Sequence, residues 1–115
     1  MAAEPRLICD AEEVIDAGNG FRFEVEREGK PSPAFLIRFR GKVYGYLNRC
    51  AHISIELDWN QGEFFDYSKL YLICSTHGAT YVPDSGHCIA GPCKGLGLQK
   101  LTVEERDGKI YVLEE

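Results

Sequence analysis

Hydrophobic and charged side chains alternate along much of the chain. In residues 21–26, Phe21, Phe23 and Val25 are separated by charged residues, which is the two-residue period of a strand with one buried face. Similar alternation, or a short apolar run, recurs along the chain between residues that favour turns. We expect strands over 21–26, 34–39, 42–48, 69–74, 98–105 and 109–115.

Two dipeptides mark tight turns between neighbouring strands. Arg40-Gly41 separates residues 34–39 from 42–48, and Asp107-Gly108 separates the last two strands. Asp-Gly is a strong hairpin signal because both turn positions need a positive φ. Residues 11–14 have the composition of one helical turn and no more. The pattern predicts an all-β fold, an antiparallel sandwich or barrel.

Two segments interrupt the rhythm of the strands. One begins with Cys-x-His at residues 50–52 and the other with Cys-x2-His at residues 74–77. The residues that follow each pair have no strand period and are typical of loops. A rigid scaffold commonly carries its functional residues on such loops. The sequence therefore predicts a stable β base with two loops that carry the chemistry.

Composition and charge limit the classes of function. The chain has 115 residues, 44% hydrophobic and 27% charged, which predicts one soluble globular domain over residues 1–115. A net charge of -5 argues against nucleic-acid binding, which needs a basic surface. No apolar stretch approaches the ~20 residues that cross a bilayer, and the first residues do not resemble a signal peptide. We expect a cytoplasmic protein that binds neither nucleic acid nor membrane.

Cys50, His52, Cys74 and His77 have the chemistry of metal ligands. Two thiolates and two imidazoles can form a tetrahedral zinc site. The same set can hold a [2Fe–2S] cluster in which two histidines replace two cysteines on one iron. In a reducing compartment, cysteines are more often metal ligands or buried side chains than disulfides. The spacing alone does not choose between zinc and the cluster.

The residues after His77 resemble those of the Rieske iron–sulfur family. They include Gly-Ala-x-Tyr at 78–81, Ser-Gly at 85–86 and Gly-Pro at 91–92. Together with the first Cys-x-His pair, the resemblance extends over the whole chain, with its specific motifs in the middle. It implies a Rieske-like antiparallel β-sandwich base and a small two-loop subdomain that binds a [2Fe–2S] cluster, with the loops at about 49–93.

The resemblance also implies which residues hold one Rieske-type [2Fe–2S] cluster. Cys50 and Cys74 would bind the inner iron, and His52 and His77 would bind the outer, more exposed iron. Pro92 would lie in a third loop that covers the cluster. Neutral imidazoles in place of thiolates remove negative charge, so the cluster accepts an electron more easily than an all-cysteine cluster does.

Some positions differ from the high-potential members of that family. Those members brace their loops with a disulfide, but the matching positions here are Ile55 and Thr76, which cannot form one. Ala79 stands where they have a serine that hydrogen-bonds a bridging sulfide. Tyr81 stands where their tyrosine donates to a ligand cysteine. The pattern implies a low to middle potential and is most similar to bacterial Rieske-type ferredoxins.

The remaining cysteines and aromatic residues have simpler interpretations. We expect Cys88 and Cys93 to be packed thiols rather than a disulfide or a second metal site, and Cys9 to lie in the core. Trp59 and the phenylalanines at 64–65 are interpreted as local packing rather than as a docking patch.

The histidine count limits the activity that this chain can have. A Rieske oxygenase also needs a mononuclear iron site with two histidines and a carboxylate. His87, expected to be exposed, is the one histidine outside the predicted ligands. We therefore expect an electron carrier without a substrate site, a ferredoxin between a reductase and a terminal oxygenase or similar enzyme. The alternatives are a small redox subunit of a nitrite-reductase-like complex and a zinc-stabilised interaction module.

Overall fold

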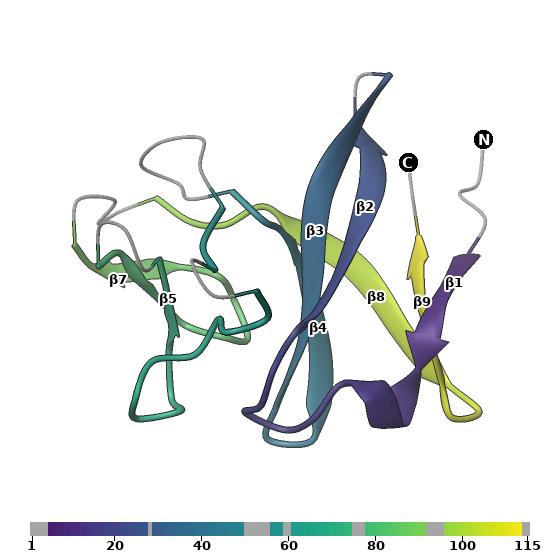
Figure 1. Ribbon diagram of the computed structural model, residues 1–115, viewed down its shortest axis with the longest axis horizontal. Helices are drawn as coiled ribbons and strands as arrows, with labels where there is room; N and C mark the ends of the chain where they lie inside the picture. The colour runs from purple at the N-terminus through teal and green to yellow at the C-terminus, as the bar shows by residue number, and fades with distance from the viewer. Residues whose placement is uncertain are drawn as a thin grey trace.

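The computed structural model describes residues 5–27, 29–49, 56–58, 61–74, 78–91 and 96–113. In these residues a larger sheet forms a base and a smaller sheet forms a subdomain beside it (Figure 1). Every pair of named strands is antiparallel. The predicted antiparallel all-β architecture is confirmed.

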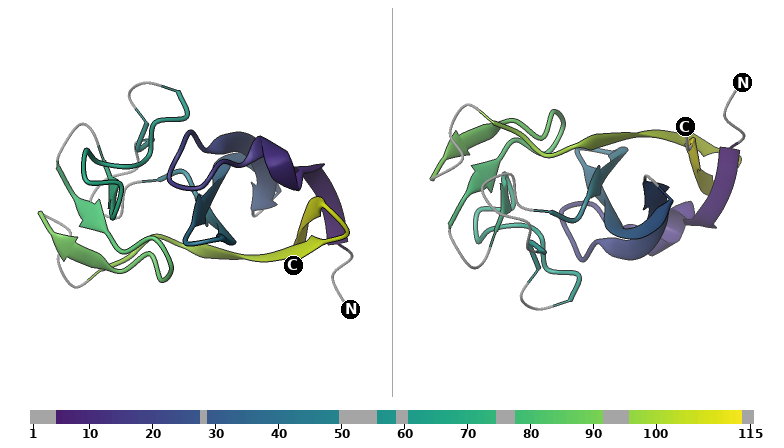
Figure 2. Two further views of the ribbon diagram at one scale, coloured as in Figure 1. Left: turned by 90° about the horizontal axis from the view of Figure 1, so that it is seen from below. Right: turned by 90° about the horizontal axis from the view of Figure 1, so that it is seen from above.

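Among the described residues, the base has six strands, in the order β1-β9-β8-β4-β3-β2 across the sheet. Their bounds are β1 (Pro5–Asp10), β2 (Phe21–Arg27), β3 (Lys30–Phe39), β4 (Lys42–Leu47), β8 (Lys100–Arg106) and β9 (Lys109–Leu113). A short 3₁₀ turn, η1 (Ala11–Glu13), follows β1 at the predicted helical turn. The sheet curls around its own core, and the subdomain lies to one side of it (Figure 2).

The subdomain sheet has, in the same residues, the strands β5 (Leu72–Ile73), β6 (Thr80–Tyr81) and β7 (Cys88–Ala90). The strand predicted over 69–74 is therefore shorter than expected. Lys69 has a φ of +63° and its amide donates to the Asp66 carbonyl oxygen (3.1 Å), so this part of the chain is still turning. β6 and β7 lie in segments predicted to be loops, because strands of two or three residues are too short to show a period.

The two predicted hairpin turns have the conformation that their residues favour. Arg40 and Gly41 have φ values of 52° and 84°, and Asp107 and Gly108 have values of 52° and 75°. Two successive positive φ angles match the right-handed twist of the flanking strands. The sequence-based prediction of both hairpins is confirmed.

The strand β3 is buried on both faces. Ala34 and Leu36 belong to the core inside the base, whereas Phe35 and Ile37 belong to a second core between the base and the subdomain. The ring of Phe35 stacks on the ring of Phe64 with centroids 3.9 Å apart. The packing predicted for Phe64 is therefore confirmed, and the continuous apolar run of β3 joins the two sheets.

The two cores have different compositions. The core of the base is formed by Cys9, Val14, Val25, Ala34, Leu36, Leu47, Leu101, Ile110 and Val112. Cys9 lies in it as predicted, and burial raises the pKa of its thiol to about 11. The core under the subdomain is formed by Phe35, Ile37, Tyr46, Leu57, Phe64, Leu72, Cys74, Ala79, Tyr81, Cys88 and Leu98.

A side-chain contact also joins the two edges of the base. β1 and β2 are the edge strands of the sheet, and Arg6 Nη1 of β1 donates to the Glu24 carbonyl oxygen of β2 (2.9 Å). The curl of the sheet thus brings its edges together. The described part of the chain contains no helix that is long and apolar enough to cross a membrane.

Arg38 connects four parts of the base. Its guanidinium donates to the carbonyl oxygens of Ala11 (3.0 Å), Val14 (2.9 Å) and Gly41 (3.0 Å) and to both carboxylate oxygens of Glu105 (3.0 and 2.9 Å). This hydrogen bonding raises the pKa of Arg38 and lowers the pKa of Glu105. The pair therefore stabilises the fold fully above the ordinary carboxyl pKa of about 4.3, and this stabilisation is lost as the pH falls through the lowered pKa.

Arg38→Lys should destabilise the base, because an ammonium cannot supply the planar fork that serves Glu105 and three carbonyl groups. We expect the free energy of unfolding to fall by about 2 kcal/mol, measured by urea titration at neutral pH with far-ultraviolet circular dichroism. Arg106→Lys is the control, since Arg106 is half exposed and its contact with Glu104 is long (3.6 Å). Equal unfolding midpoints for the two variants would show that the fork contributes nothing.

Candidate metal centre

The predicted ligands are divided between described and undescribed parts of the chain. Cys74 lies among the described residues, whereas Cys50, His52 and His77 lie outside them, as does Pro92. Among the described residues, no three metal-ligating side chains lie together. Of the four predicted ligands, only Cys74 belongs to these residues. The described part of the candidate site therefore consists of Cys74 and of the segments that lead into and out of the loops.

The second ligand loop begins where β5 ends. Cys74 follows Ile73 directly, and its amide donates to the Ala79 carbonyl oxygen (2.8 Å), while the Gly78 amide donates to the Cys74 carbonyl oxygen (2.8 Å). These two bonds extend the β5–β6 ladder and close the loop at its base. The Cys74 side chain is fully buried and is not part of a disulfide. The loop thus leaves and re-enters the sheet at one fixed point.

Ala79 and Tyr81, predicted to surround the ligand cysteine, are both fully buried in the same core as Cys74. Ala79 lies across from Cys74 at the loop base, and it offers no hydroxyl group. Tyr81 in β6 pairs with Leu72, two residues before Cys74. Both residues therefore lie close to Cys74 along the ladder, and their influence on a bound group remains a prediction.

The start of the third predicted loop lies against the second loop. Gly91 has a φ of +92°, and a Cβ atom on it would be 2.8 Å from the Ala79 Cα atom and 3.1 Å from the Gly78 carbonyl oxygen. Both neighbours are backbone atoms, which cannot move aside cheaply. Only glycine allows this close approach together with this φ angle. The residue before Pro92 is therefore packed on the loop that follows Cys74.

Cys88 differs from its prediction, because it is disulfide-bonded rather than a packed thiol. Cys93 lies outside the described residues. The chain leaves β7 after Ala90 and returns beside it, since the Cys88 amide donates to the Leu96 carbonyl oxygen (2.9 Å). The expectation of thiols rested on the reducing compartment, and it could not take into account a chain that returns to the strand holding Cys88.

The first ligand loop follows β4 and is closed by two side chains that the sequence analysis missed. Asn48 Nδ2 donates to Asp58 Oδ1 (2.9 Å), and Asn48 Oδ1 accepts from the Leu57 amide (2.8 Å). Asp58 Oδ2 accepts from the Gly62 amide (2.9 Å). Asn48 and Asp58 are both buried. No local signal marks this pair, since its members are ten residues apart and each is a common loop residue.

Arg22 of β2 ties the return of the first loop to the base. Its Nη2 atom donates to Glu56 Oε2 (2.8 Å). Its Nε atom lies 3.1 Å from Asp58 Oδ2 but without the alignment of a hydrogen bond, so this contact is an ion pair only. The Gly20 amide also donates to the Gly62 carbonyl oxygen (2.8 Å). The loop is therefore held from β2 as well as from β4.

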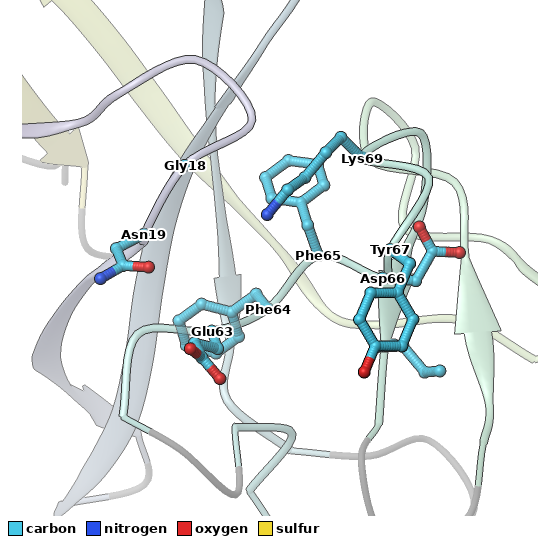
Figure 3. Close-up of a pocket in the computed structure, with 9 residues that line it drawn as sticks. Gly18, Asn19, Glu63, Phe64, Phe65, Asp66, Tyr67 and Lys69 are labelled. Atoms are coloured by element: carbon cyan, nitrogen blue, oxygen red, sulfur yellow. The ribbon is translucent and has the colours of Figure 1, made fainter.

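A cavity of about 410 Å³ lies between the base and the subdomain. Figure 3 shows Gly18 and Asn19 on one side of it and Phe65, Tyr67 and Lys69 on the other. Tyr67 is fully exposed. His87 is also exposed, as predicted, and Trp59 lies outside the described residues. The described residues that line the cavity include no cysteine or histidine.

Comparisons with known proteins identify the fold. A model of the family described as "Rieske [2Fe-2S] domain" matches residues 4–102. The ferredoxin of carbazole 1,9a-dioxygenase from Nocardioides aromaticivorans IC177 has a TM-score of 0.72 at 20% identity, covering 96% of this chain and 98% of that chain. A Sphingomonas yanoikuyae B1 ferredoxin has a TM-score of 0.73 at 20% identity, covering 97% and 100%. No curated protein matches the sequence.

A third solved structure is a complex of reduced oxygenase and oxidized ferredoxin in carbazole 1,9a-dioxygenase. Its matching chain has a TM-score of 0.73 at 22% identity, covering 96% of this chain and 94% of that chain. At this level of identity the likeness shows the fold, which agrees with the arrangement of base and subdomain seen here.

Gly91→Ala should disturb the contact between the second and third loops. The left-handed φ angle alone costs a non-glycine residue about 1–2 kcal/mol, and the clash with Ala79 adds to that cost. Gly29→Ala is the matched control, because Gly29 also has a positive φ (+75°) but would place its Cβ atom in open space. We expect a clearly larger loss of stability in thermal unfolding for Gly91→Ala. Equal losses would mean that the loops are not in tight contact.

Proposed function

Because the chain belongs to the Rieske [2Fe–2S] domain family, we propose that it is a ferredoxin that carries single electrons on one Rieske-type [2Fe–2S] cluster. Cys50, His52, Cys74 and His77 hold the cluster in this proposal. The electron donor is a reductase, and the acceptor is a terminal oxygenase or a similar enzyme. We further propose that residues 1–115 form one domain and that the protein is cytoplasmic.

The position of Cys74 is the observation that supports the ligand assignment. Its thiol is buried and outside any disulfide, and it lies at the point where the second loop is closed by the pairing with Ala79. A thiol held at a fixed loop base is suited to bind iron. His77, the next proposed ligand, is three residues further along the closed loop. The donor set and the loop base therefore fit the cluster that the family carries.

The bound cluster supplies the exchange of one electron at a potential that its surroundings adjust. The chain contributes those surroundings. The buried side chains of Ala79 and Tyr81 set how many hydrogen bonds reach the site, and the apolar core around Cys74 limits the access of water. The imidazoles of His52 and His77 provide the exposed end of the site in this proposal.

The role of ferredoxin is supported by solved structures whose matching chain is almost fully covered. They include the ferredoxin of carbazole 1,9a-dioxygenase from Nocardioides aromaticivorans IC177, covered to 98%, and a complex of reduced oxygenase and oxidized ferredoxin, whose matching chain is covered to 94%. A second iron site for substrate oxidation would need two histidines and a carboxylate, and His87 is the one histidine left after the proposed ligands. We therefore propose that this chain has no substrate site of its own and binds redox partner proteins, but neither nucleic acid nor a membrane.

The purified protein should be red-brown and should contain about two irons and two acid-labile sulfides per chain. Cys74→Ser should lose the cluster, because an alcohol is a poor ligand for iron. Cys9→Ser is the matched control, since Cys9 is a buried cysteine in the core of the base, and it should keep full iron and sulfide contents. Stoichiometric zinc without visible absorption, in protein made anaerobically with ample iron, would refute the proposal.

The midpoint potential should depend on the two buried side chains beside Cys74. Ala79→Ser adds a hydroxyl donor and should raise the potential, and Tyr81→Phe removes one and should lower it, each by roughly 40 mV, the one-electron equivalent of about 1 kcal/mol. Protein-film voltammetry measures both shifts. Tyr46→Phe is the control, because its hydroxyl instead donates to the Pro83 carbonyl oxygen. If both variants have the wild-type potential, hydrogen bonding from these positions does not tune the cluster.

A further inference from the structure

We propose that Asn48 and Asp58 form a clamp that positions the first ligand loop, so that the protein itself fixes both ends of the loop. This proposal rests on the proposed function, since Cys50 and His52 are ligands only if the chain binds the cluster. The two residues act through the loop and are positioning residues. We call this pair, with its hydrogen bonds to the amides of Leu57 and Gly62, the Asn48–Asp58 clamp.

The clamp can form in one arrangement only. Asn48 uses its oxygen as an acceptor for the Leu57 amide and its nitrogen as a donor to Asp58. Asp58 uses one carboxylate oxygen for Asn48 and the other for the Gly62 amide. Turning the Asn48 amide over would place two donors against each other at Leu57 and two acceptors against each other at Asp58. The hydrogen-bond pattern therefore fixes the relative position of residues 48, 57 and 62.

Burial makes the clamp strong. Asn48 is 1% exposed and Asp58 is 6% exposed, so a broken hydrogen bond would leave a polar group without water to replace its partner. The Asp58 charge is balanced by Arg22 at 3.1 Å. Arg22 in turn donates to Glu56, on the same returning segment of the loop. The returning segment is thus held by charge as well as by the clamp.

The clamp is anchored in the rigid part of the molecule. Asn48 directly follows the last residue of β4, and its backbone amide donates to the Pro33 carbonyl oxygen of β3 (2.8 Å). Leu57 is fully buried in the core under the subdomain. Gly62 has a φ of +88° and accepts from the Gly20 amide. The first loop therefore leaves from and returns to fixed points, and residues 50 and 52 lie two and four positions after the first of them.

An exchange of the two side chains tests the clamp directly. Asp58→Asn leaves one oxygen for two donors, Asn48 and the Gly62 amide, so one bond is lost. Asn48→Asp places two carboxylates against each other. In the double variant Asn48→Asp/Asp58→Asn, the carboxylate at position 48 accepts from the backbone amide of Leu57 and from the side-chain amide at position 58. The side-chain oxygen at position 58 accepts from the backbone amide of Gly62. All three hydrogen bonds are restored with the polarity of the pair reversed.

The first readout is the rate at which the holoprotein loses its visible absorbance to an iron chelator. We expect each single variant to lose the cluster about tenfold faster than wild type, the factor for one buried hydrogen bond, and to show changed visible circular dichroism. The double variant should lose the cluster clearly more slowly than either single variant, although it does not restore the ion pair of Arg22 with position 58. Glu63→Gln is the control directly after this segment, and it should change little because Glu63 is exposed.

The second readout is amide hydrogen exchange at Leu57 and Gly62, which reports the clamp itself. It should accelerate in the single variants and recover in the double variant, while exchange in β8 and β9 stays unchanged. Wild-type protein without iron or sulfide would refute the proposed function, yet these amides would still test the clamp. The clamp would be overturned if the single variants had wild-type exchange and cluster-loss rates. It would also be overturned if the effects of the two substitutions simply added in the double variant. If a single variant does not fold, rescue by the double variant supports the clamp and failure of rescue overturns it.

Discussion

The burial of β3 on both of its faces is the constraint on which the rest of the molecule depends. A strand with one face in solvent needs only one apolar face. The run at residues 34–37, in contrast, packs on the core of the base with one face and on the subdomain with the other. The stack of Phe35 on Phe64 carries the contact across the boundary. The subdomain is therefore attached through apolar packing. A substitution that changes the packing of β3 would also shift the subdomain.

The described ends of the two loops that carry the proposed ligands are closed by different means, and in both cases the hydrogen bonds lie at the ends of the loop. Main-chain hydrogen bonds between Cys74, Gly78 and Ala79 close the second loop, and these bonds continue the β5–β6 ladder. The first loop is longer, and buried side chains of Asn48 and Asp58 close it instead. Loops that begin and end at fixed points have less conformational entropy to lose when they bind a ligand.

The sequence predicted those parts of the structure that depend on neighbouring residues. The alternation in 21–26 and the Asp107-Gly108 turn have local causes, so both were predicted correctly. The features that were missed depend on contacts between distant residues. The pairing of Asn48 with Asp58 requires knowledge of how the loop returns, and the disulfide of Cys88 requires knowledge that the chain comes back beside β7. The four ligands came from a motif and stay a prediction; Cys74 lies at the closed base of the second loop.

The contact between Arg6 of β1 and the Glu24 carbonyl of β2 has a consequence for crowded solutions. The edge strand of an open sheet offers unpaired amides and carbonyls to any other extended chain, which is a common route to aggregation. Here the Arg6 side chain of one edge strand donates to the Glu24 carbonyl oxygen of the other, so this acceptor is not offered to a further chain. In the proposed role of an electron carrier, which meets one partner after another, a fold whose edge strands are partly occupied by each other is an advantage.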